Sequence, residues 1–173
     1  MGKELDIKKT LLIVLPLLLI VGCSKPINEE ILIDKDELKY HPDTKELYSG
    51  KVFKNHMGGE KEFEGSYKDG KRDGLWKKWS ENELSNFKYF TYYRNGKKEQ
   101  EQLYKDEKLS FTTGWYENGK KKSQGIPKDG KVDGDGLWTF WYENGQKKYE
   151  GTYKDGKLVE VIGEWNEDGS VKE

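Results

Sequence analysis

The sequence predicts an all-β fold: an elongated antiparallel sheet of stacked β-hairpin repeats that follows an N-terminal signal segment and a tether. Asp-Gly and Asn-Gly pairs recur between segments rich in tyrosine, tryptophan and phenylalanine, and such pairs favour tight hairpin turns because they adopt positive φ readily. The segments between them tend to alternate in polarity with a period of two, which is typical of strands. The 173 residues include no alanine, and 20 of them are glycine, which disfavours helices.

The first expected element is a secretory signal peptide over residues 1–22. Its charged part contains Lys3, Lys8 and Lys9. An apolar stretch over residues 11–22 follows, and this order of charged and apolar residues is typical of exported proteins. The stretch is too short for a transmembrane helix, which needs roughly 20 apolar residues. We therefore expect the protein to be exported.

The apolar stretch leads into Gly22-Cys23-Ser24, which resembles the lipobox of bacterial lipoproteins. The resemblance implies lipidation of Cys23 with palmitate-type acyl chains, which would hold the protein at a membrane. Cys23 is the sole cysteine of the sequence, so an intramolecular disulfide is excluded. In the lipoproteins that the sequence resembles, an aspartate at the place of Ser24 favours retention at the inner membrane. We therefore expect a lipid-anchored protein of a bacterial membrane, with the outer membrane favoured if the host has one.

Residues 23–38 are expected to form a tether between the lipid and the folded body. This run contains Pro26 and many charged side chains, so it is expected to be a spacer with one short helical turn. The repeat domain is then expected over residues 39–173.

Two short units alternate along this domain. The run YKDGK at residues 67–71 recurs at 153–157, and the run WYENG at residues 115–119 recurs at 141–145. Each Asp-Gly or Asn-Gly pair is expected to reverse the chain through a type I′ turn. The glycines expected at turns are Gly70, Gly96, Gly119, Gly130, Gly145, Gly156 and Gly169.

A second set of glycines precedes an aromatic residue by two positions. Each is expected to leave room for a large ring to lie across the neighbouring backbone. The pairs are Gly74 and Trp76, Gly136 and Trp138, Gly151 and Tyr153, and Gly163 and Trp165.

These units resemble the bacterial variant of the MORN repeat, a β-hairpin unit of roughly two dozen residues that stacks into an elongated, twisted sheet. The chain also resembles bacterial proteins called YwqK-type antitoxins, which have the same architecture. The resemblance covers residues 40–169. It weakens between Asn82 and Ser110, where Glu83 and Glu107 replace turn glycines.

The charge of the chain argues against nucleic acid as a partner. Its 31 basic and 32 acidic residues give a net charge of -1, so no overall positive field attracts polyanions. Arg72 and Arg94 are the arginines of the sequence, and lysine lacks the bidentate fork of arginine. Hydrophobic residues make up 33% of the chain, and aromatic residues alone make up 13%, which leaves little material for a large aliphatic core.

No arrangement of residues in the sequence predicts catalysis, a cofactor or a metal. Catalysis needs a nucleophile with a base within reach, and the two histidines, His41 and His56, lie in polar stretches expected to be loops. The run Asp129–Gly136 has the glycines of a calcium loop. However, Lys131 occupies a ligand position there, and Phe140 occupies the twelfth position, where a bidentate glutamate is required. We therefore expect a protein that is not an enzyme.

The expected function is binding, because a stacked hairpin sheet leaves long faces in water. The leading hypothesis is a non-catalytic envelope lipoprotein that binds an unidentified protein or envelope component. The rings expected to form its contact surface are Trp76, Trp79, Trp115, Trp138, Trp141 and Trp165. One alternative, implied by the YwqK-type resemblance, is an antitoxin or immunity-like protein that neutralises a toxin by binding. Another is a glycan or cell-wall binding module whose rings stack on sugars.

Overall fold

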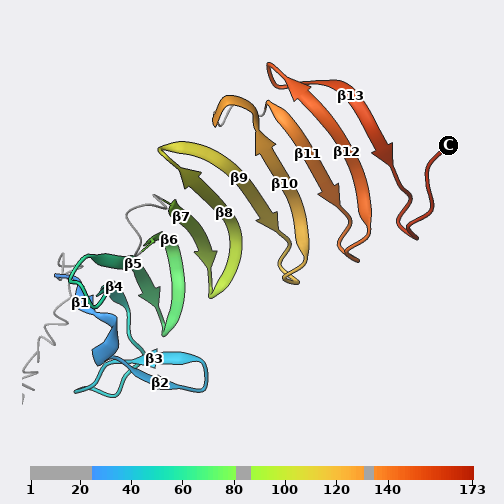
Figure 1. The fold of residues 1–173 in the computed structure, drawn as a ribbon. Helices are drawn as coiled ribbons and strands as arrows, with labels where there is room; N and C mark the ends of the chain where they lie inside the picture. Colours follow the sequence, from blue (N-terminus) through green and yellow to red (C-terminus); the bar gives the residue numbers. More distant parts are fainter. Residues whose placement is uncertain (1–24, 81–86, 131–134) are drawn as a thin grey trace, which may run out of the picture.

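The computed structural model describes residues 25–80, 87–130 and 135–173 of the chain (Figure 1). These residues form an eleven-stranded sheet and a two-stranded sheet, and they contain no α-helix. The predicted fold class, one long sheet of hairpin strands, is confirmed. The predicted signal peptide, Cys23 and Glu83 lie outside the described residues, as do residues 131–134 of the run compared with calcium loops. Within the described part, no helix is long and apolar enough to cross a membrane.

The strands of the large sheet follow one another in chain order, so each pairs with its neighbours along the sequence. All these pairings are antiparallel except that of β1 with β4, which is parallel. The strands are β1 (Ile27–Asn28), β4 (Gly50–Asn55), β5 (Lys61–Lys68), β6 (Lys71–Trp79), β7 (Phe87–Arg94), β8 (Lys97–Lys105), β9 (Lys108–Trp115), β10 (Lys121–Pro127), β11 (Gly136–Trp141), β12 (Lys147–Lys154) and β13 (Lys157–Glu164). The smaller elements are the hairpin of β2 (Ile33–Lys35) and β3 (Leu38–Tyr40) and the 3-10 turns η1 (Glu29–Ile31) and η3 (Lys128–Gly130). Figure 1 shows the large sheet as a single twisted layer, with the β2–β3 hairpin beside its N-terminal end.

The connections between strands lie along two margins, which we call the lower and the upper margin after their places in Figure 1. The lower margin carries the turns at residues 69–70, 95–96, 116–120, 142–146 and 166–170. The upper margin carries connections at residues 56–60, 106–107, 128–135 and 155–156.

The predicted turn glycines all have positive φ. Gly130 ends the 3-10 turn η3 and not a type I′ turn, and the other six lie in turns of two kinds. Both residues of the pair have positive φ at Asp69-Gly70, Asn95-Gly96 and Asp155-Gly156, as a type I′ turn requires. In the Glu-Asn-Gly turns only the glycine has positive φ. There, the Gly119 N–H donates to the Tyr116 carbonyl over 2.9 Å, which is a type I turn followed by a glycine. The type I′ prediction is therefore wrong for these turns, because their loop contains an additional residue.

The five-residue turns change margin along the chain. The turn His56–Glu60 lies at the upper margin, where the His56 N–H donates to the Glu60 carbonyl over 2.7 Å. The equivalent turns at residues 116–120, 142–146 and 166–170 lie at the lower margin. Two-residue turns, at 95–96 and 106–107, bound β8 at both ends. They shift the alternation by one strand.

The same shift moves the aromatic packing from one face of the sheet to the other. Directly paired residues of neighbouring strands point to the same face. What we call the first face carries the paired row Trp76, Thr91, Glu101, Thr113, Gln124 and Thr139. Trp138 and Phe140 flank Thr139 in β11 and therefore point to the opposite, second face. Trp76 thus packs on the first face near the N-terminal end, and Trp138 packs on the second face further along.

The N-terminal segment differs from the tether that the sequence predicted over residues 23–38. Ile27 and Asn28 form β1 and pair with Val52 and Phe53 of β4, and Leu32 is buried in the core. The expected short helical turn is present as η1. The folded body therefore begins at β1 and not at residue 39. The aliphatic side chains among the charges cover the edge that β4 would otherwise leave open.

A hydrophobic core cluster lies at this N-terminal end, while Leu103 and Leu109 are also buried further along the sheet. The buried members of the cluster are Leu32, Tyr48, Val52, Tyr67 and Trp76. The Tyr67 hydroxyl donates to Glu29 Oε1 over 2.6 Å, which ties η1 to the sheet. Burial, and then this hydrogen bond, raises the pKa of the Tyr67 hydroxyl above its ordinary range.

Large aromatic rings lie over several glycines, as predicted. Most of these glycines are not the ones that precede the aromatic residue by two positions. A Cβ at Gly65 would collide with the Trp76 ring, and one at Gly125 would lie 2.7 Å from the Trp138 ring. Among the predicted pairs, Gly163 is covered by Trp165. The prediction is wrong at Gly74, where a Cβ would meet nothing within 4 Å, because the ring lies across the paired strand and not along its own.

Glu107 occupies a turn position that favours glycine, so replacing it should stabilise the protein. Glu107 has a φ of 63°, a conformation that costs a residue with a Cβ about 1 kcal/mol. We expect Glu107→Gly to raise the free energy of unfolding by somewhat less than about 1 kcal/mol, because the ion pair of Glu107 with Lys88 is lost. Urea denaturation would measure this. The control Glu107→Ala loses the ion pair and keeps the strain, so equal stability of the two variants would contradict the explanation.

Candidate binding surface

The described residues offer little that could support chemistry. They contain no group of three or more His, Cys, Asp or Glu residues placed to hold a metal ion. Both histidines lie in loops, as predicted: His41 Nδ1 accepts the Asp43 N–H over 3.3 Å, and His56 Nε2 lies 3.3 Å from the Trp79 carbonyl. Each histidine therefore contacts the backbone of its surroundings.

The six tryptophans predicted as a contact surface divide into one core residue and five half-buried ones. Trp76 is 5% exposed, so its inclusion in a binding surface was wrong. It packs at the centre of the core because Gly65 lets its ring lie on the backbone. The half-buried rings are Trp79, Trp115, Trp138, Trp141 and Trp165.

A lysine ammonium group lies over each of four of the half-buried rings. The pairs, with the distance from the ammonium nitrogen to the ring centre, are Lys61 and Trp79 at 5.5 Å, Lys98 and Trp115 at 5.4 Å, Lys121 and Trp141 at 5.6 Å, and Lys147 and Trp165 at 5.3 Å. Each distance fits a cation–π contact. We call these the Lys–Trp pairs. Because these lysines lie over the rings, less of each ring surface is accessible to a ligand.

The same lysines also contact the residue three positions further along. Lys147 Nζ donates to Glu150 over 2.8 Å, and Lys121 Nζ donates to Gln124 over 3.3 Å. Lys147, and then the Thr139 hydroxyl, lowers the pKa of the Glu150 carboxyl. The spacing Lys-x-x-Glu or Lys-x-x-Gln is visible in the sequence and could have identified these contacts in advance.

The WYENG units build the scaffold by joining successive turns of the lower margin. The Tyr116 hydroxyl donates to the Trp141 carbonyl over 2.8 Å, and Asn118 Nδ2 donates to the Glu143 carbonyl over 2.9 Å. The next unit repeats this with the Tyr142 hydroxyl, 3.0 Å from the Trp165 carbonyl. Tyrosine and asparagine of this unit therefore hold the turns together.

An open groove lies on the second face at the lower margin. It has a volume of about 620 Å³ and extends from the lower ends of β6 and β7 across β8, β9 and β10 to β11. Its floor consists of Gln100, Thr112, Gly114 and Ser123, and Trp138 borders it. The floor is low because Gly114 has no side chain and those of Thr112 and Ser123 are small. Aromatic pairs stand on either side of it along the same face, Phe90 with Tyr104 and Trp138 with Phe140.

The groove is positively charged. Its cations are Lys71, Arg94, Lys97, Lys98 and Lys122, and its acids are Glu99 and Glu117. Arg94 Nε lies 2.9 Å from Glu99, and Lys98 Nζ lies 2.9 Å from Glu101. Three cations remain, and they form no ion pair with a carboxylate in the part of the chain that the structure describes: Lys71, Lys97 and Lys122.

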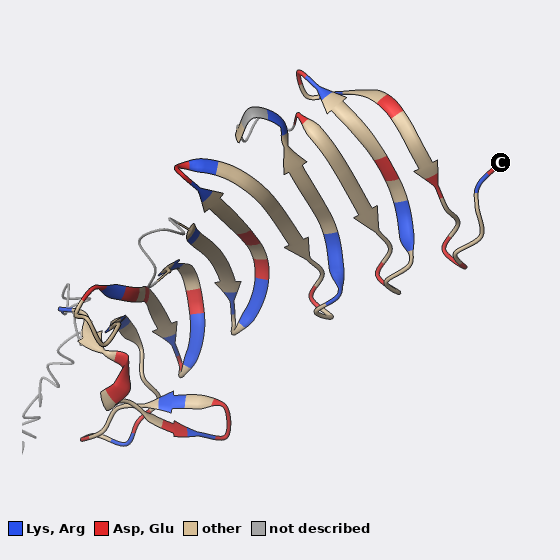
Figure 2. Ribbon diagram, in the orientation of Figure 1, with Lys and Arg blue, Asp and Glu red and all other residues tan. Residues whose placement is uncertain are grey.

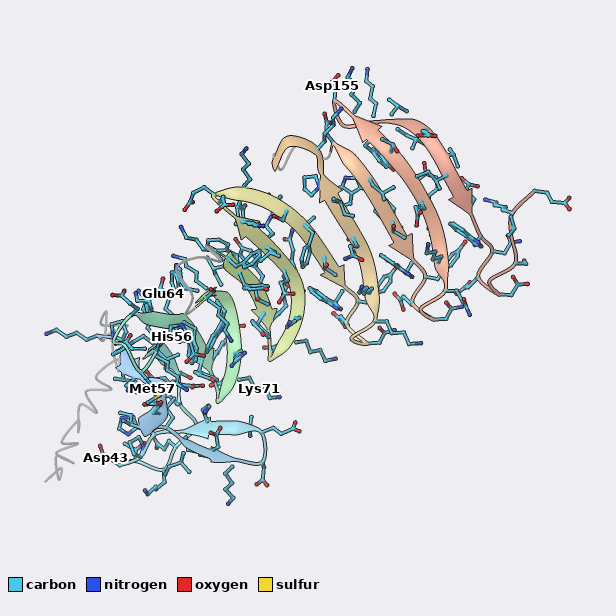
Figure 3. The ribbon with its side chains drawn as sticks, viewed as in Figure 1. Asp43, His56, Met57, Glu64, Lys71 and Asp155 are labelled. Carbon is cyan, nitrogen blue, oxygen red and sulfur yellow. The ribbon has the colours of Figure 1, made fainter. Side chains whose placement is uncertain are left out.

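The charge of the groove continues along the lower margin. Basic residues begin every second strand there, in the pairs Lys71-Arg72, Lys97-Lys98, Lys121-Lys122 and Lys147-Lys148. Figure 2 shows them as blue segments at the lower ends of β6, β8, β10 and β12. In Figure 3, Lys71 lies at this margin and Asp155 at the opposite one. The doubled basic residues were visible in the sequence, but the groove depends on the pairing of strands, and sequence reasoning missed it.

A second cavity, of about 520 Å³, lies on the first face beside the core. The Arg72 guanidinium lies 4.3 Å from the Trp76 ring centre and donates to the Tyr93 hydroxyl over 3.3 Å. This arginine is part of the packing around Trp76, so the cavity belongs to the scaffold of the N-terminal end.

Comparison with known proteins supports the repeat architecture. Residues 88–106 and 134–155 match the family described as MORN repeat variant. The first match lies between Asn82 and Ser110, so the expectation that the resemblance weakens there was wrong. No curated protein matches the chain. Among solved structures, the chain is similar to a mutant of S. aureus TarM in complex with Fondaparinux, alpha-GlcNAc-glycerol and UDP, with a TM-score of 0.44 and 10% identity over 64% of this chain and 21% of that one. A second structure, described as TarM, has a TM-score of 0.41 and 11% identity over 57% of this chain and 19% of that one. The chain thus spans about a fifth of the length of these proteins.

Proposed function

We propose that this MORN-repeat protein is a non-catalytic binding protein of the bacterial envelope, anchored through a lipid on Cys23, whose ligand binds in the groove of the second face. The observation that carries this proposal is the groove itself. It combines a small polar floor, a half-buried tryptophan at its border and three lysines without a carboxylate partner. Pockets in which a few polar groups converge beside apolar surface are typical ligand sites.

The anchor would hold the N-terminal end of the sheet near the membrane. The folded body begins at Ile27, so four residue spacings separate it from Cys23. An extended chain covers at most about 3.6 Å per spacing, which leaves β1 within about 14 Å of the lipidated residue. The centre of the groove floor then lies further out, because β9 is five strands from β4, or about 24 Å along the sheet at a strand spacing of about 4.8 Å.

Filling the groove should abolish ligand capture without affecting the fold. Ser123 lies in the floor beside Gly114, so Ser123→Tyr places a ring where the ligand would lie. We expect the lipidated full-length protein to capture an envelope component from solubilised native membranes, and Ser123→Tyr to capture none of it. Circular dichroism and the urea midpoint should stay unchanged. Cys23→Ser should lose acyl labelling and move to the soluble fraction.

The control is Ser110→Tyr, a serine of β9 that does not line the groove. Equal capture by Ser123→Tyr and Ser110→Tyr would contradict the proposed site. A Cys23→Ser protein that stays in the membrane fraction would contradict the proposed anchor.

A glycan ligand is a second candidate that one observation favours, namely the hydroxyl and amide side chains of the floor, which suit the hydroxyl groups of sugars. The antitoxin alternative stays a prediction. Relief of growth arrest on co-expression with a toxin encoded next to this gene would test it.

A further inference from the structure

We propose that the groove binds a linear acidic polysaccharide, with its anionic groups on Lys71, Lys97 and Lys122 and a sugar ring against Trp138. This inference rests on the proposed binding function and names the class of ligand. It concerns the groove of the second face and its continuation along the lower margin.

The three lysines without a carboxylate partner indicate an anionic ligand. The other cations around the groove are neutralised locally, Arg94 by Glu99 and Lys98 by Glu101. Lys71, Lys97 and Lys122 come from three different strands and line one cavity. Charges that line a concave surface concentrate counter-ions there. A chain with a net charge of -1 can therefore attract an anion locally while its overall field does not.

The floor indicates that the anion is carried by sugars. Gln100 Nε2 donates to the Thr112 hydroxyl over 3.3 Å, and the Ser123 hydroxyl lies beside Gly114. Hydroxyl and amide groups both donate and accept hydrogen bonds, as sugar hydroxyls require. Trp138 is half-buried and borders this polar floor, so the flat apolar side of a pyranose ring can pack against it.

The repetition along the lower margin indicates a polymer. The basic pairs begin β6, β8, β10 and β12, so they recur every two strands, or about every 10 Å. That spacing is comparable with the disaccharide repeat of an extended polysaccharide. A ligand with regularly spaced charges could engage several pairs at once, which raises its apparent affinity.

Two other sources of anionic groups fit less well. A lipid headgroup would have to reach the floor of the groove on β8 to β10, about 19–29 Å along the sheet from β4. A single-stranded nucleic acid needs a series of open aromatic faces for its bases, and lysines lie over Trp79, Trp115, Trp141 and Trp165. A sugar needs only one ring, and Trp138 lies beside the cations of the groove.

The test is a titration of the lipidated full-length protein, in detergent micelles, with defined polymers. Polygalacturonate supplies carboxylates on sugars and phosphomannan supplies phosphates on sugars. Neutral dextran, inorganic polyphosphate and a thymidine oligonucleotide are the comparison probes. We expect at least one acidic polysaccharide to bind, to change the tryptophan fluorescence and to weaken as NaCl rises from about 50 to about 200 mM. The double variant Lys97→Gln/Lys122→Gln should weaken binding about tenfold.

The matched control is Lys154→Gln/Lys157→Gln, which removes two exposed lysines at the upper margin and should change nothing. Equal losses in both double variants would overturn the inference, because any lysines would then suffice. Tighter binding of polyphosphate or the oligonucleotide than of both acidic polysaccharides would also overturn it. If no polysaccharide binds while Ser123→Tyr still abolishes envelope capture, this inference fails and the proposed function stands. If Ser123→Tyr also captures normally, the proposed function itself fails.

Discussion

Trp76→Ala is expected to lower the free energy of unfolding by about 3–5 kcal/mol, the usual cost of removing a large buried ring. Trp76 is 5% exposed, and its truncation would leave a cavity against the backbone of Gly65. A loss of this size approaches the whole stability of many domains. We therefore expect the N-terminal end of the sheet to be largely unfolded at 37 °C in this variant.

The expected loss of unfolding free energy is large because several groups pack on the Trp76 ring. Tyr67 meets the Trp76 ring edge-on with the ring centres 5.2 Å apart, and Phe63 lies 5.6 Å away. The Arg72 guanidinium stacks 4.3 Å from the same ring. The indole N–H donates to the Ser66 carbonyl over 3.1 Å, so truncation also removes the hydrogen bond of that carbonyl.

Trp79→Ala is the control, because this ring is only half-buried at the end of β6. We expect it to cost about 1 kcal/mol. Urea denaturation compares the two variants, and native-state hydrogen exchange shows where stability is lost, since hairpin repeats contact mainly their neighbours. Equal losses for Trp76→Ala and Trp79→Ala would show that the two rings do not differ as the structure indicates.

The sequence was sufficient for the fold class and for most of the turns because those depend on local chemistry. The pairs Asp69-Gly70, Asn95-Gly96 and Asp155-Gly156 mark reversals, and their glycines have the positive φ that the turns need. Asp73-Gly74, by contrast, lies within β6. The margin on which a turn lies depends instead on the number of strands before it. The sequence located the turn at Glu107, but without a glycine it did not show that the loop has two residues, so the shift around β8 was not predicted.

The candidate site was predicted less well, because it depends on which residues the pairing brings together. Trp76 and Trp138 occur in the same Gly-x-Trp pattern, yet Trp76 is buried and Trp138 borders the groove. The difference arises from distant segments. Leu32 and Tyr48 join the cluster of Trp76, whereas the surface near Trp138 has the small residues Gly114 and Ser123.

Leu32→Ala is expected to lower the free energy of unfolding by about 2–4 kcal/mol, although Leu32 lies in a segment whose sequence indicates a tether. Leu32 is 6% exposed and belongs to the same core cluster as Val52 and Trp76. The Leu32 N–H also donates to the Glu29 carbonyl over 3.0 Å, which closes η1 and fixes the direction of the side chain. The change should therefore loosen η1 and expose the edge of β4.

Ile33→Ala gives the matched control, one residue further along the same segment. Ile33 is 37% exposed, so we expect a loss below about 1 kcal/mol. Both variants remove aliphatic groups from adjacent positions, and a tether would respond weakly to either change. A large loss for Leu32→Ala alone, measured by urea denaturation, would establish that the folded body includes this segment. Small and equal losses of unfolding free energy would support the tether that the sequence predicted. The folded body would then begin further along the chain, and β1 would not have to lie close to the lipid on Cys23.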